Sequence, residues 1–588
     1  MSENRRARQE DSYDEAARER FGSGGGRFGF GPGGGGLPGV FILMCVLLLG
    51  IVGRLAYLQL VEGQKLADAA EKRRTNEQTL MARRGTIYDR NGNVLAMSEE
   101  CYDVYCNPKE VTDADAQSNM LASWLGGDAS TYKETLTKDT TFAYLVRKAS
   151  KGACESLRKE LLSNEYAGVY LLEQTKRVYP YGEVCGQILG MVNTDNVGIS
   201  GLELAYDKDL AGTNGKLTME TGLGGTPIAG AAAEVKEPVD GKDLVLSIDV
   251  DVQRCVEEQV AGSLEQNDAK SGFAMACDPR SGEIIAACST PYANLTKPEE
   301  LTNEALNLKM VSNSYDPGSI FKVLTAAIGL ESGTVQSSTY FTVPPTILVG
   351  HDIVADDDGR GEYMQMNLRE VLRRSSNVGA ALIAQEAIGA DTFAQGIEKF
   401  GIGQLTGIDY PGESAGIVKR REEYDGSSVG SMSFGQGLSI PMVQMVRAVG
   451  SIANGGKLLT PHFVASVDGQ PLDWPSQGTS ISEDTAEKVR DMMRTVVEDG
   501  TATTAAVEGY DIAAKTGTGE EAENGKYIKG RYLASLIGFA PASNPQILLY
   551  VGLNETPYLA YSSAGPVFSA IMGEVLEDMG ILSSYSDV

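Results

Sequence analysis

The segment YDPGSIFKVLTAAIGLESG, residues 315–333, predicts a buried helix. Pro317 and the glycine after it interrupt the chain, and the helical pattern begins about at Ser319. From Ser319 to Leu330 the only charged side chain belongs to Lys322. A helix that is apolar on nearly all sides is buried, so we expect this segment to lie in the centre of a large domain.

The same helix carries two residues with the makings of a catalytic pair. Ser319 and Lys322 are three positions apart, so they share one face of the helix. Burial lowers the pKa of a lysine, and a hydroxyl beside a desolvated amine is what an activated serine nucleophile requires. The free N–H groups of the first turn can also stabilise an oxyanion. The alternative is a serine N-cap with a snorkelling lysine, because the SxxK pattern is short.

A second polar group interrupts LREVLRRSSNVGAALIAQEAIG, residues 368–389. Ser375, Ser376 and Asn377 fall between two helical patterns in this segment. The first and third of these residues can point both side chains into one cleft. The alternative is that the group serves only as the N-cap of the second helix.

A third polar group follows a short strand pattern in YDIAAKTGTGEEA, residues 510–522. Apolar side chains alternate over 510–514, which predicts a half-buried strand that ends in a cation and hydroxyls. The residues at this strand end are Lys515, Thr516, Gly517 and Thr518. Such groups suit a substrate carboxylate, and the glycine allows a backbone to approach closely. The alternative is an ordinary lysine at the edge of a loop.

The rest of the chain predicts at least two folded units, because 588 residues exceed the size of one growing core. Asn91-Gly92 predicts a hairpin, and 110–175 have the spacing of amphipathic helices. Residues 177–217 suggest turns and short strands. A strand that runs into a helix after Gly241 marks a second domain, and FAMACDPRSGEIIAACS, residues 273–289, predicts a hairpin.

The N-terminal region predicts a tail and one membrane helix. Residues 1–36 are charged and glycine-rich, which is typical of a flexible, disordered tail. Residues 37–61 are apolar apart from Arg54 and are long enough to cross a bilayer. A cleaved signal peptide is the alternative, but the long polar tail and the missing cleavage site favour an uncleaved anchor.

Composition excludes several classes of function. The net charge of −28 repels nucleic acid, so we expect no nucleic-acid partner. Two histidines, His351 and His462, leave little material for a histidine triad or a metal site. The acidic loop at 355–362 lacks the glutamate that an EF-hand requires at its twelfth position, where Asn367 stands. We expect no metal and no cofactor.

The three polar groups occur in the order SxxK, SxN and KTG, which is the pattern of penicillin-binding proteins and serine β-lactamases. After residue 37, nearly the whole chain resembles a class B penicillin-binding protein of the division or sporulation branch. Further segments that resemble family motifs are RRGTIYDRNGNVLA (83–96), RVYPYGEVCGQILG (177–190), GISGLE (198–203), SFGQGLSIPMVQ (433–444) and EDGTATTA (498–505). The chain departs from the family at Ala514, at Gly519 and at Ser376, where many relatives have aspartate and no role is transferred.

This resemblance implies an α/β (α+β) fold. A transpeptidase domain at 246–588, with an antiparallel sheet flanked by helices, would follow an elongated α+β pedestal, or dimerisation, domain at 62–245. It also implies a serine D-Ala-D-Ala transpeptidase that β-lactams acylate. Ser319 would be the nucleophile and Lys322 its base. The implied proton relay is Ser375 with Asn377 and Lys515, and the implied substrate-binding residues are Thr516, Gly517 and Thr518.

The resemblance also implies partners and a location. The substrates would be peptidoglycan stem peptides that end in D-Ala-D-Ala, and the partners a SEDS-type membrane glycosyltransferase and divisome proteins. The tail at 1–36 would be cytoplasmic and the catalytic domain extracellular. The alternatives are a D,D-carboxypeptidase, a β-lactam sensor without turnover and a divisome scaffold. The large pedestal argues against a carboxypeptidase, and the single membrane span argues against a sensor. The intact motifs argue against a scaffold without catalysis.

Overall fold

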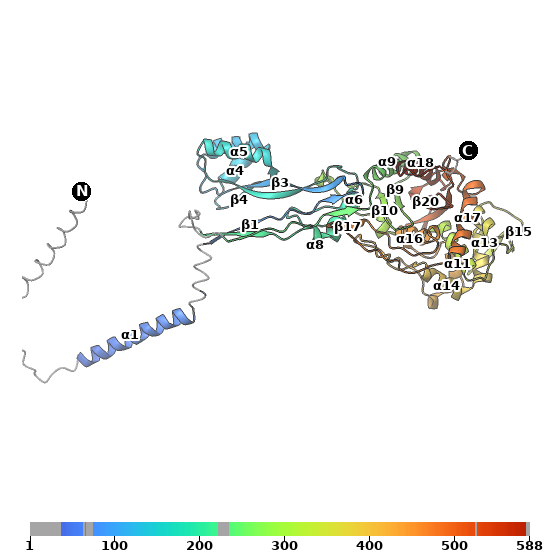
Figure 1. The fold of residues 1–588 in the computed structure, drawn as a ribbon, viewed down its shortest axis with the longest axis horizontal. Helices are drawn as coiled ribbons and strands as arrows, with labels where there is room; N and C mark the ends of the chain where they lie inside the picture. The colour runs from blue at the N-terminus through green and yellow to red at the C-terminus, as the bar shows by residue number, and fades with distance from the viewer. Residues whose placement is uncertain (1–36, 63–64, 66–74, 221–233, 524–525, 584–588) are drawn as a thin grey trace, which may run out of the picture. The chain divides into compact units, whose positions relative to one another are not determined.

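The computed structural model describes residues 37–62, 65, 75–220, 234–523 and 526–583 (Figure 1). The predicted tail at 1–36 lies outside these residues. The chain divides into two compact units. One contains Thr79–Leu217 and Val235–Val588, and the other contains Met1–Gln78 and Thr218–Glu234. The predicted domain boundaries at 61/62 and 245/246 stay predictions.

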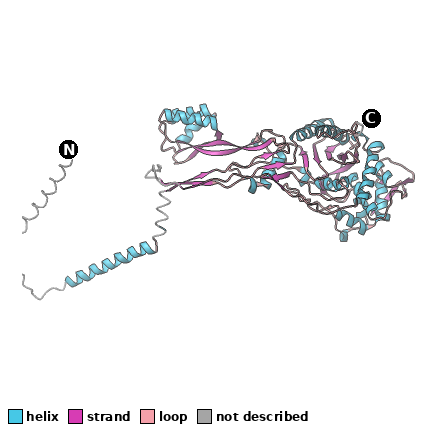
Figure 2. Cartoon of the chain, viewed as in Figure 1, coloured by secondary structure: helices cyan, strands magenta, loops and turns pink. Residues whose placement is uncertain are grey.

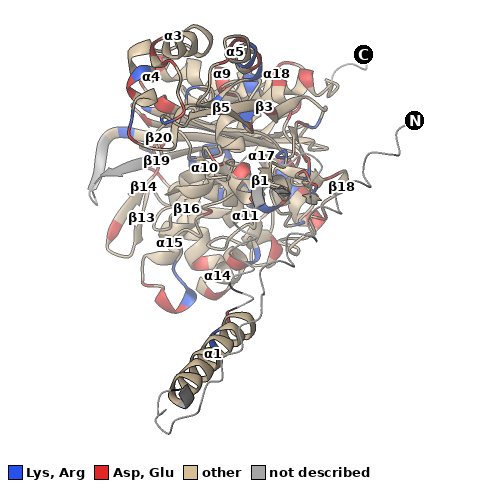
Figure 3. Cartoon of the chain, turned by 90° about the vertical axis from the view of Figure 1, so that its left-hand side faces the viewer, with Lys and Arg blue, Asp and Glu red and all other residues tan. Residues whose placement is uncertain are grey.

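Helix α1 spans Leu37–Leu60. Among the described residues, it contains the one helical segment, Gly39–Leu60, that is long and apolar enough to cross a membrane. Figure 3 shows it almost free of charged residues, and Arg54 is the single exception. At about 1.5 Å per residue, a helix of this length exceeds the ~30 Å hydrocarbon core of a bilayer. The apolar helix α1 therefore fits a single-pass membrane anchor.

We call residues 246–588, the predicted transpeptidase domain, the catalytic half. It is built on a five-stranded antiparallel sheet with the order β10-β9-β21-β20-β19 (Figure 2). Its strands are β9 (Ser271–Cys277), β10 (Ile284–Ser289), β19 (Ala513–Glu523), β20 (Lys526–Ala540) and β21 (Ile547–Thr556). The predicted hairpin is confirmed: β9 and β10 pair across a turn in which Gly282 has φ +87°. Strand β19, which carries the KTG residues, lies at the edge of the sheet.

Helices cover both faces of this sheet (Figure 1). Helices α9 (Val250–Gln266) and α18 (Ala564–Asp578) lie side by side against one face. On the other face are α11 (Lys322–Glu331), α16 (Met442–Ala453) and α17 (Glu483–Asp499). In α11, every residue from Lys322 to Gly329 is buried, as the sequence predicts. The α/β class with an antiparallel sheet flanked by helices is confirmed.

Short elements surround α11. The polar group at 375–377 lies between α12 (Leu368–Arg374) and α13 (Asn377–Leu382), so the predicted break between two helices is confirmed. The remaining helices of this half are α10 (Lys309–Ser312), α14 (Ala390–Lys399), α15 (Ser428–Ser433) and the π-helix Ile383–Ile388. The short strand pairs are β11 (Ser314–Tyr315) with β16 (Ile440–Pro441), β12 (Phe341–Val343) with β15 (Met364–Met366), and β13 (Thr346–Val349) with β14 (Asp352–Ala355).

The pedestal sheet continues into the catalytic half. Its order is β18-β17-β8-β2-β3-β4, and β5 also pairs with β3. The strands are β2 (Ile87–Tyr88), β3 (Val94–Cys106), β4 (Ala143–Ser150), β5 (Val169–Val178), β8 (Leu244–Leu246), β17 (Val464–Val467) and β18 (Gln470–Pro471). The Asn91-Gly92 hairpin between β2 and β3 is confirmed. Strand β8 pairs with both β2 and β17, so one sheet and one core link the two halves.

Two local predictions for the pedestal are confirmed only in part. Residues 110–175 contain not only α3 (Ala114–Leu125), α4 (Ala129–Leu136) and α5 (Lys151–Ser163) but also strand β4 and most of β5. Pairing with β3 on both sides overrides the helical spacing there. Residues 177–217 form the short helices α6 (Gly186–Leu189), α7 (Gly201–Ala205) and α8 (Asp207–Leu210) as well as turns. Strands β1 (Thr75–Leu80), β6 (Gly215–Glu220) and β7 (Glu234–Lys236) form a separate sheet.

Candidate active site

A tight turn places Ser319 at the entrance to α11. Gly318 has φ +56°, a left-handed conformation that suits glycine, and its N–H donates to the carbonyl of Gly435 at 3.1 Å. Ser319 follows in the 3-10 turn Gly318–Phe321. The serine is half-buried, whereas Lys322 is 1% exposed. The hydroxyl is therefore within reach of solvent while the neighbouring amine is not.

The ammonium of Lys322 contacts three oxygens. Its Nζ donates to Ser319 Oγ at 2.8 Å, to the Ser375 carbonyl at 2.6 Å and to Ser375 Oγ at 3.2 Å. Burial lowers the pKa of Lys322 to about 7, although the charges of Asp357 and Asp356 oppose this shift. At neutral pH a large fraction of this amine is thus unprotonated and can accept a proton.

Ser375 connects the two buried lysines. Its Oγ accepts from Lys515 Nζ at 2.9 Å and lies 3.2 Å from Lys322 Nζ. Ser375 ends α12 in the left-handed region, with φ +58°. This conformation is rare for a residue with a side chain, and it directs the hydroxyl toward both amines. The three polar groups that the sequence singled out are therefore joined by hydrogen bonds between 2.8 and 3.2 Å long.

Lys515 lies inside strand β19 and not at its end, so the predicted strand end is wrong. Pairing with β20 continues through Lys515↔Ile537 and beyond, which keeps the strand extended past the KTG residues. The Lys515 side chain is fully buried, and its Nζ also donates to the carbonyl of Thr516 at 3.0 Å. Burial, followed by the nearby charge of Lys322, lowers the pKa of Lys515 well below its usual value.

The other predicted site residues of the KTG segment follow Lys515 in strand β19. Thr516 Oγ1 is 3.0 Å from Thr501 Oγ1. A Cβ on Gly517 would lie 2.7 Å from Ser535 Oγ and 2.9 Å from Ile320, so β19 can approach the serine turn only with glycine there. Thr518 is half-buried, and its carbonyl oxygen lies 3.1 Å from where a Cβ on Gly318 would be.

Asn377 is joined to this group less directly. It is half-buried at the first position of α13, and its side-chain nitrogen lies 3.5 Å from the carbonyl of Ala355. The structure thus brings Asn377 to the same turn as Ser375, and the contact it makes there is long. Among the described residues, no group of three or more His, Cys, Asp or Glu side chains is arranged to hold a metal ion.

Sequence analysis missed the buried residues that hold the catalytic segments in place. Asp356 bonds to the turn at 376–378, and Thr325 Oγ1 donates to the Ser433 carbonyl at 2.7 Å, which ties α11 to another family segment. No local pattern signals these contacts, because the partners are far apart in the chain. The resemblance of 433–444 to a family motif was the one available signal.

Comparison with known proteins shows the family to which the chain belongs. The family model for the penicillin binding protein transpeptidase domain matches residues 272–573, and the model for the penicillin-binding protein dimerisation domain matches 79–246. Stage V sporulation protein D of Bacillus subtilis is 31% identical over 92% of this chain and 86% of its own length. Peptidoglycan D,D-transpeptidase FtsI of Escherichia coli is 30% identical over 92% of both chains.

A solved structure has the same fold. The crystal structure of penicillin binding protein 3 from Mycobacterium tuberculosis, complexed with aztreonam, has a TM-score of 0.67 and 25% identity. The match covers 86% of this chain and 98% of that one. Both family models together span the pedestal and the catalytic half, including all three polar groups. On the strength of these matches and of a site that unites SxxK, SxN and KTG, the chain belongs to the class B penicillin-binding proteins.

Proposed function

We propose that this chain cross-links the stem peptides of peptidoglycan through an acyl-enzyme on Ser319. The chain is a serine-type D-Ala-D-Ala transpeptidase that acts in cell-wall synthesis during division or sporulation. The observation that carries the proposal is the 2.8 Å contact between Ser319 Oγ and the buried amine of Lys322. A hydroxyl beside an amine whose pKa is about 7 has a base at hand at neutral pH.

In the first step, neutral Lys322 accepts the proton of Ser319 Oγ while this oxygen attacks the carbonyl carbon of the penultimate D-Ala. Collapse of the tetrahedral intermediate breaks the amide bond to the terminal D-Ala. The leaving amine receives a proton through Ser375, whose Oγ lies between the amines of Lys322 and Lys515. Asn377 completes this relay on the same turn. The terminal D-Ala then leaves and the ester on Ser319 remains.

In the second step, an amine from another stem peptide attacks the ester. Its proton returns to Ser319 Oγ along the same relay, so the serine is regenerated and a new amide bond forms. Water in place of the amine would release the shortened peptide, which is the carboxypeptidase outcome. Both outcomes use the same residues, so the acceptor alone decides which product forms.

The edge strand β19 and the serine turn supply the remaining contacts. Thr516 and Thr518 bind the substrate carboxylate, with Lys515 behind them, and Gly517 permits close packing of β19 on the turn. The backbone N–H groups of Ser319 and Thr518 form the oxyanion hole. In comparable sites, loss of one such donor costs about 3–4 kcal/mol of transition-state stabilisation.

The same site binds β-lactams, which present a strained amide where the D-Ala-D-Ala bond would lie and acylate Ser319. We further propose that residues 1–36 are cytoplasmic and 62–588 extracellular, with the pedestal at 62–245 and the transpeptidase domain at 246–588. The orientation follows from the extracellular location of peptidoglycan. The proposed partners are a SEDS-type membrane glycosyltransferase and divisome proteins, since class B proteins lack a glycosyltransferase domain of their own.

Covalent labelling tests the nucleophile. Ser319→Ala should keep the thermal unfolding midpoint near that of the wild type and lose all labelling by a fluorescent penicillin. The control is Ser332→Ala at the exposed C-terminal end of the same helix, which should label at the wild-type rate. Persistent labelling of the Ser319→Ala protein would refute the assignment. Cross-linked dimers formed from lipid II with a glycosyltransferase, rather than free D-Ala alone, would separate the transpeptidase from the carboxypeptidase.

A further inference from the structure

The turn that carries Ser375 is held in an unfavourable conformation. A non-glycine residue in the left-handed region costs free energy of about 1 kcal/mol or more, and it persists only where surrounding contacts enforce it. With φ +58°, Ser375 is such a residue, and its Oγ must also stay within 3.2 Å of two amines. The contacts that enforce this turn therefore matter to the site.

One carboxylate bonds the turn at two points. Asp356 Oδ2 accepts from Ser376 Oγ at 2.6 Å, and Asp356 Oδ1 accepts from the N–H of Val378 at 2.9 Å. Ser376 Oγ in turn accepts from the N–H of Gly379 at 2.9 Å, so it caps α13 and binds the carboxylate at once. Asp356 is 9% exposed and Ser376 only 1%. Asp356 therefore holds both the residue after Ser375 and the first turn of α13.

The carboxylate is itself fixed from the other side. Arg360 donates to Asp356 Oδ2 from Nε at 3.1 Å and from Nη2 at 2.7 Å. Its Nη1 lies 3.2 Å from the Val343 carbonyl and 3.3 Å from that of Glu362, and its side chain is 8% exposed. Burial alone would raise the pKa of Asp356, but the bonds from Ser376, Val378 and Arg360 lower it, so the group is ionised.

We propose that Asp356, fixed by Arg360, is a positioning residue that clamps the 375–378 turn and so keeps Ser375 Oγ between the two lysine amines. The inference rests on the proposed function, because it assigns importance to the position of Ser375. It joins two sequence features that had no role: the acidic loop at 355–362 and the middle residue of SxN. The carboxylate that Ser376 binds comes from a loop 20 residues upstream.

A role as a simple helix cap would predict a different outcome. Loss of a cap lowers stability by about 1 kcal/mol and leaves the chemistry of the folded molecules unchanged. Loss of a clamp displaces Ser375, and a displacement of about 1 Å can lower a rate by about 10²-fold. The rate constant for acylation by a fluorescent penicillin separates these outcomes, since a smaller folded fraction changes the amplitude of labelling and not its rate constant.

The first experiment compares Asp356→Asn with Asp358→Asn. We expect Asp356→Asn to lower the acylation rate constant by about 10²-fold. Asp358→Asn removes the same charge from the same loop. Asp358 accepts from the N–H of Arg360 at 3.2 Å, and its carboxylate lies 3.9 Å from Arg360 Nε and 3.8 Å from Arg374 Nη1. Among the described residues it bonds no atom of the turn at 375–378, so its rate constant should stay within a few-fold of the wild type. The acid limb of the Asp356→Asn rate profile should also move to lower pH, because Asp356 and Asp357 both raise the pKa of Lys322.

The second experiment is a rescue. The double variant Asp356→Ala with Ser376→Asp returns a carboxylate to the turn, where the cap position lets it accept from the N–H groups at 378 and 379. We expect acylation within about 10-fold of the wild type, against about 10²-fold loss in Asp356→Ala alone. A wild-type rate constant in Asp356→Asn, or a double variant as slow as Asp356→Ala, would overturn the proposal. Ser319→Ala in the same series keeps the two proposals apart, because labelling of that protein would refute the nucleophile instead.

Discussion

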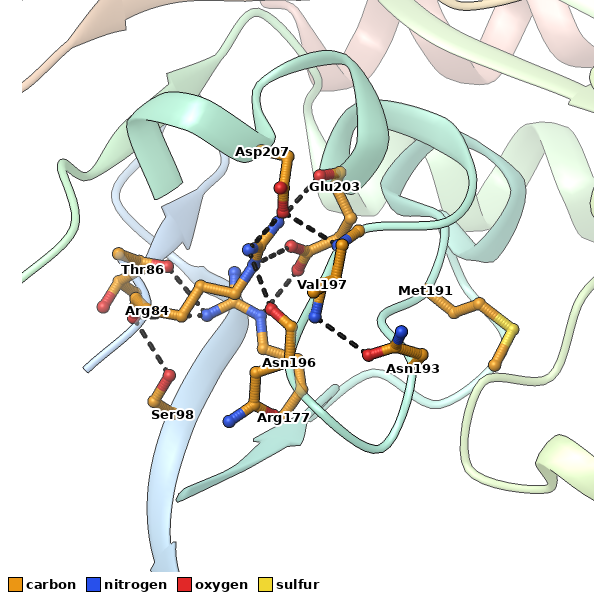
Figure 4. Close-up of polar contacts among 12 residues, drawn as sticks. Arg84, Thr86, Ser98, Arg177, Met191, Asn193, Asn196, Val197, Glu203 and Asp207 are labelled. Carbon is orange, nitrogen blue, oxygen red and sulfur yellow. Dashed lines mark hydrogen bonds and ion pairs between the residues drawn. The ribbon is translucent and has the colours of Figure 1, made fainter. Parts of the chain in front are cut away.

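A pair of buried cations in the pedestal and a pair in the catalytic half compensate their charge in different ways. In the pedestal, Arg84 Nε and Arg177 Nε bind the two oxygens of Glu203 at 2.5 and 2.6 Å, and all three side chains are at most 2% exposed (Figure 4). In the catalytic half, Lys322 and Lys515 bind hydroxyl and carbonyl oxygens. Among the described residues, neither lysine forms an ion pair with a carboxylate.

This difference separates a structural cluster from a reactive one. The planar guanidinium of arginine matches a carboxylate, so both arginines of the pedestal cluster are paired. Lysine without a partner carboxylate responds to burial by a fall in its pKa, and both catalytic lysines do so. Burial of paired arginines therefore stabilises the pedestal, whereas burial of unpaired lysines lowers their pKa and prepares the site for catalysis.

The pedestal cluster also explains why three separate family segments come together. Arg84 comes from 83–96, Arg177 from 177–190 and Glu203 from 198–203. Arg84 Nη1 also donates to Asp207 at 2.7 Å, and Arg177 Nη1 donates to the Gly85 carbonyl at 2.7 Å (Figure 4). Buried ion pairs and hydrogen bonds therefore hold these three segments together.

The largest expected effect is on the acylation rate, when a catalytic lysine is replaced by arginine, the cation of the pedestal. Lys322→Arg keeps the charge but removes the capacity to act as a base, so acylation by a fluorescent penicillin should slow by about 10³-fold. Lys297→Arg, whose side chain is 53% exposed, is the control and should acylate at the wild-type rate. Unfolding midpoints measured in parallel show that the proteins are folded. Acylation within tenfold of the wild type would mean that Lys322 is not the base.

The converse change breaks the pairing in the pedestal. Glu203→Gln removes the carboxylate that the two buried guanidinium groups share and, among the described residues, leaves only Arg84 paired, through Asp207. This change should lower the free energy of unfolding by about 3–5 kcal/mol. The acylation rate constant of the molecules that remain folded should stay unchanged. Glu99→Gln, which removes a surface ion pair with Lys176, should cost less than about 1 kcal/mol. Urea titration measures both, and equal losses in the two variants would show that burial of the cluster contributes nothing.

Sequence analysis predicted the local part of the catalytic cluster better than its assembly. The contact between Ser319 and Lys322 follows from helical spacing alone, whereas the approach of Ser375 and Lys515 depends on tertiary packing and came only from the family resemblance. Lys515 was misplaced at a strand end because β20, not the local pattern, decides where β19 stops. The bond from Ser376 to Asp356 and the pairing of Glu203 could not be predicted, since nothing in either segment specifies its partner.

Burial shifts the pKa of Glu257 in the opposite direction to that of the catalytic lysines. This residue lies where the pedestal meets the catalytic half. Its Oε1 accepts from the N–H of Cys185 at 3.1 Å and from Gln253 Nε2 at 2.7 Å, and the residue is 7% exposed. Burial, opposed by the bonds from Gln253 and Cys185 and aided by the carboxylates of Glu183 and Glu258, raises the pKa of Glu257 to about 7. A carboxyl group without a cation therefore takes up a proton, as a lysine without a carboxylate gives one up.

The smallest expected effect is a pH dependence of stability from this group. The folded state holds the Glu257 proton up to about pH 7, whereas the unfolded chain releases it near its ordinary value of 4.5. Its contribution is therefore complete below about pH 4.5 and is lost as the pH rises through 7, by at most about 3 kcal/mol. Glu257→Gln mimics the protonated carboxyl, so it should match the wild type near pH 4.5 and exceed it in unfolding free energy at pH 8. Parallel stability curves for the two proteins between these pH values would show that Glu257 is ionised in the folded state, and that burial without a countercharge does not govern protonation at this junction.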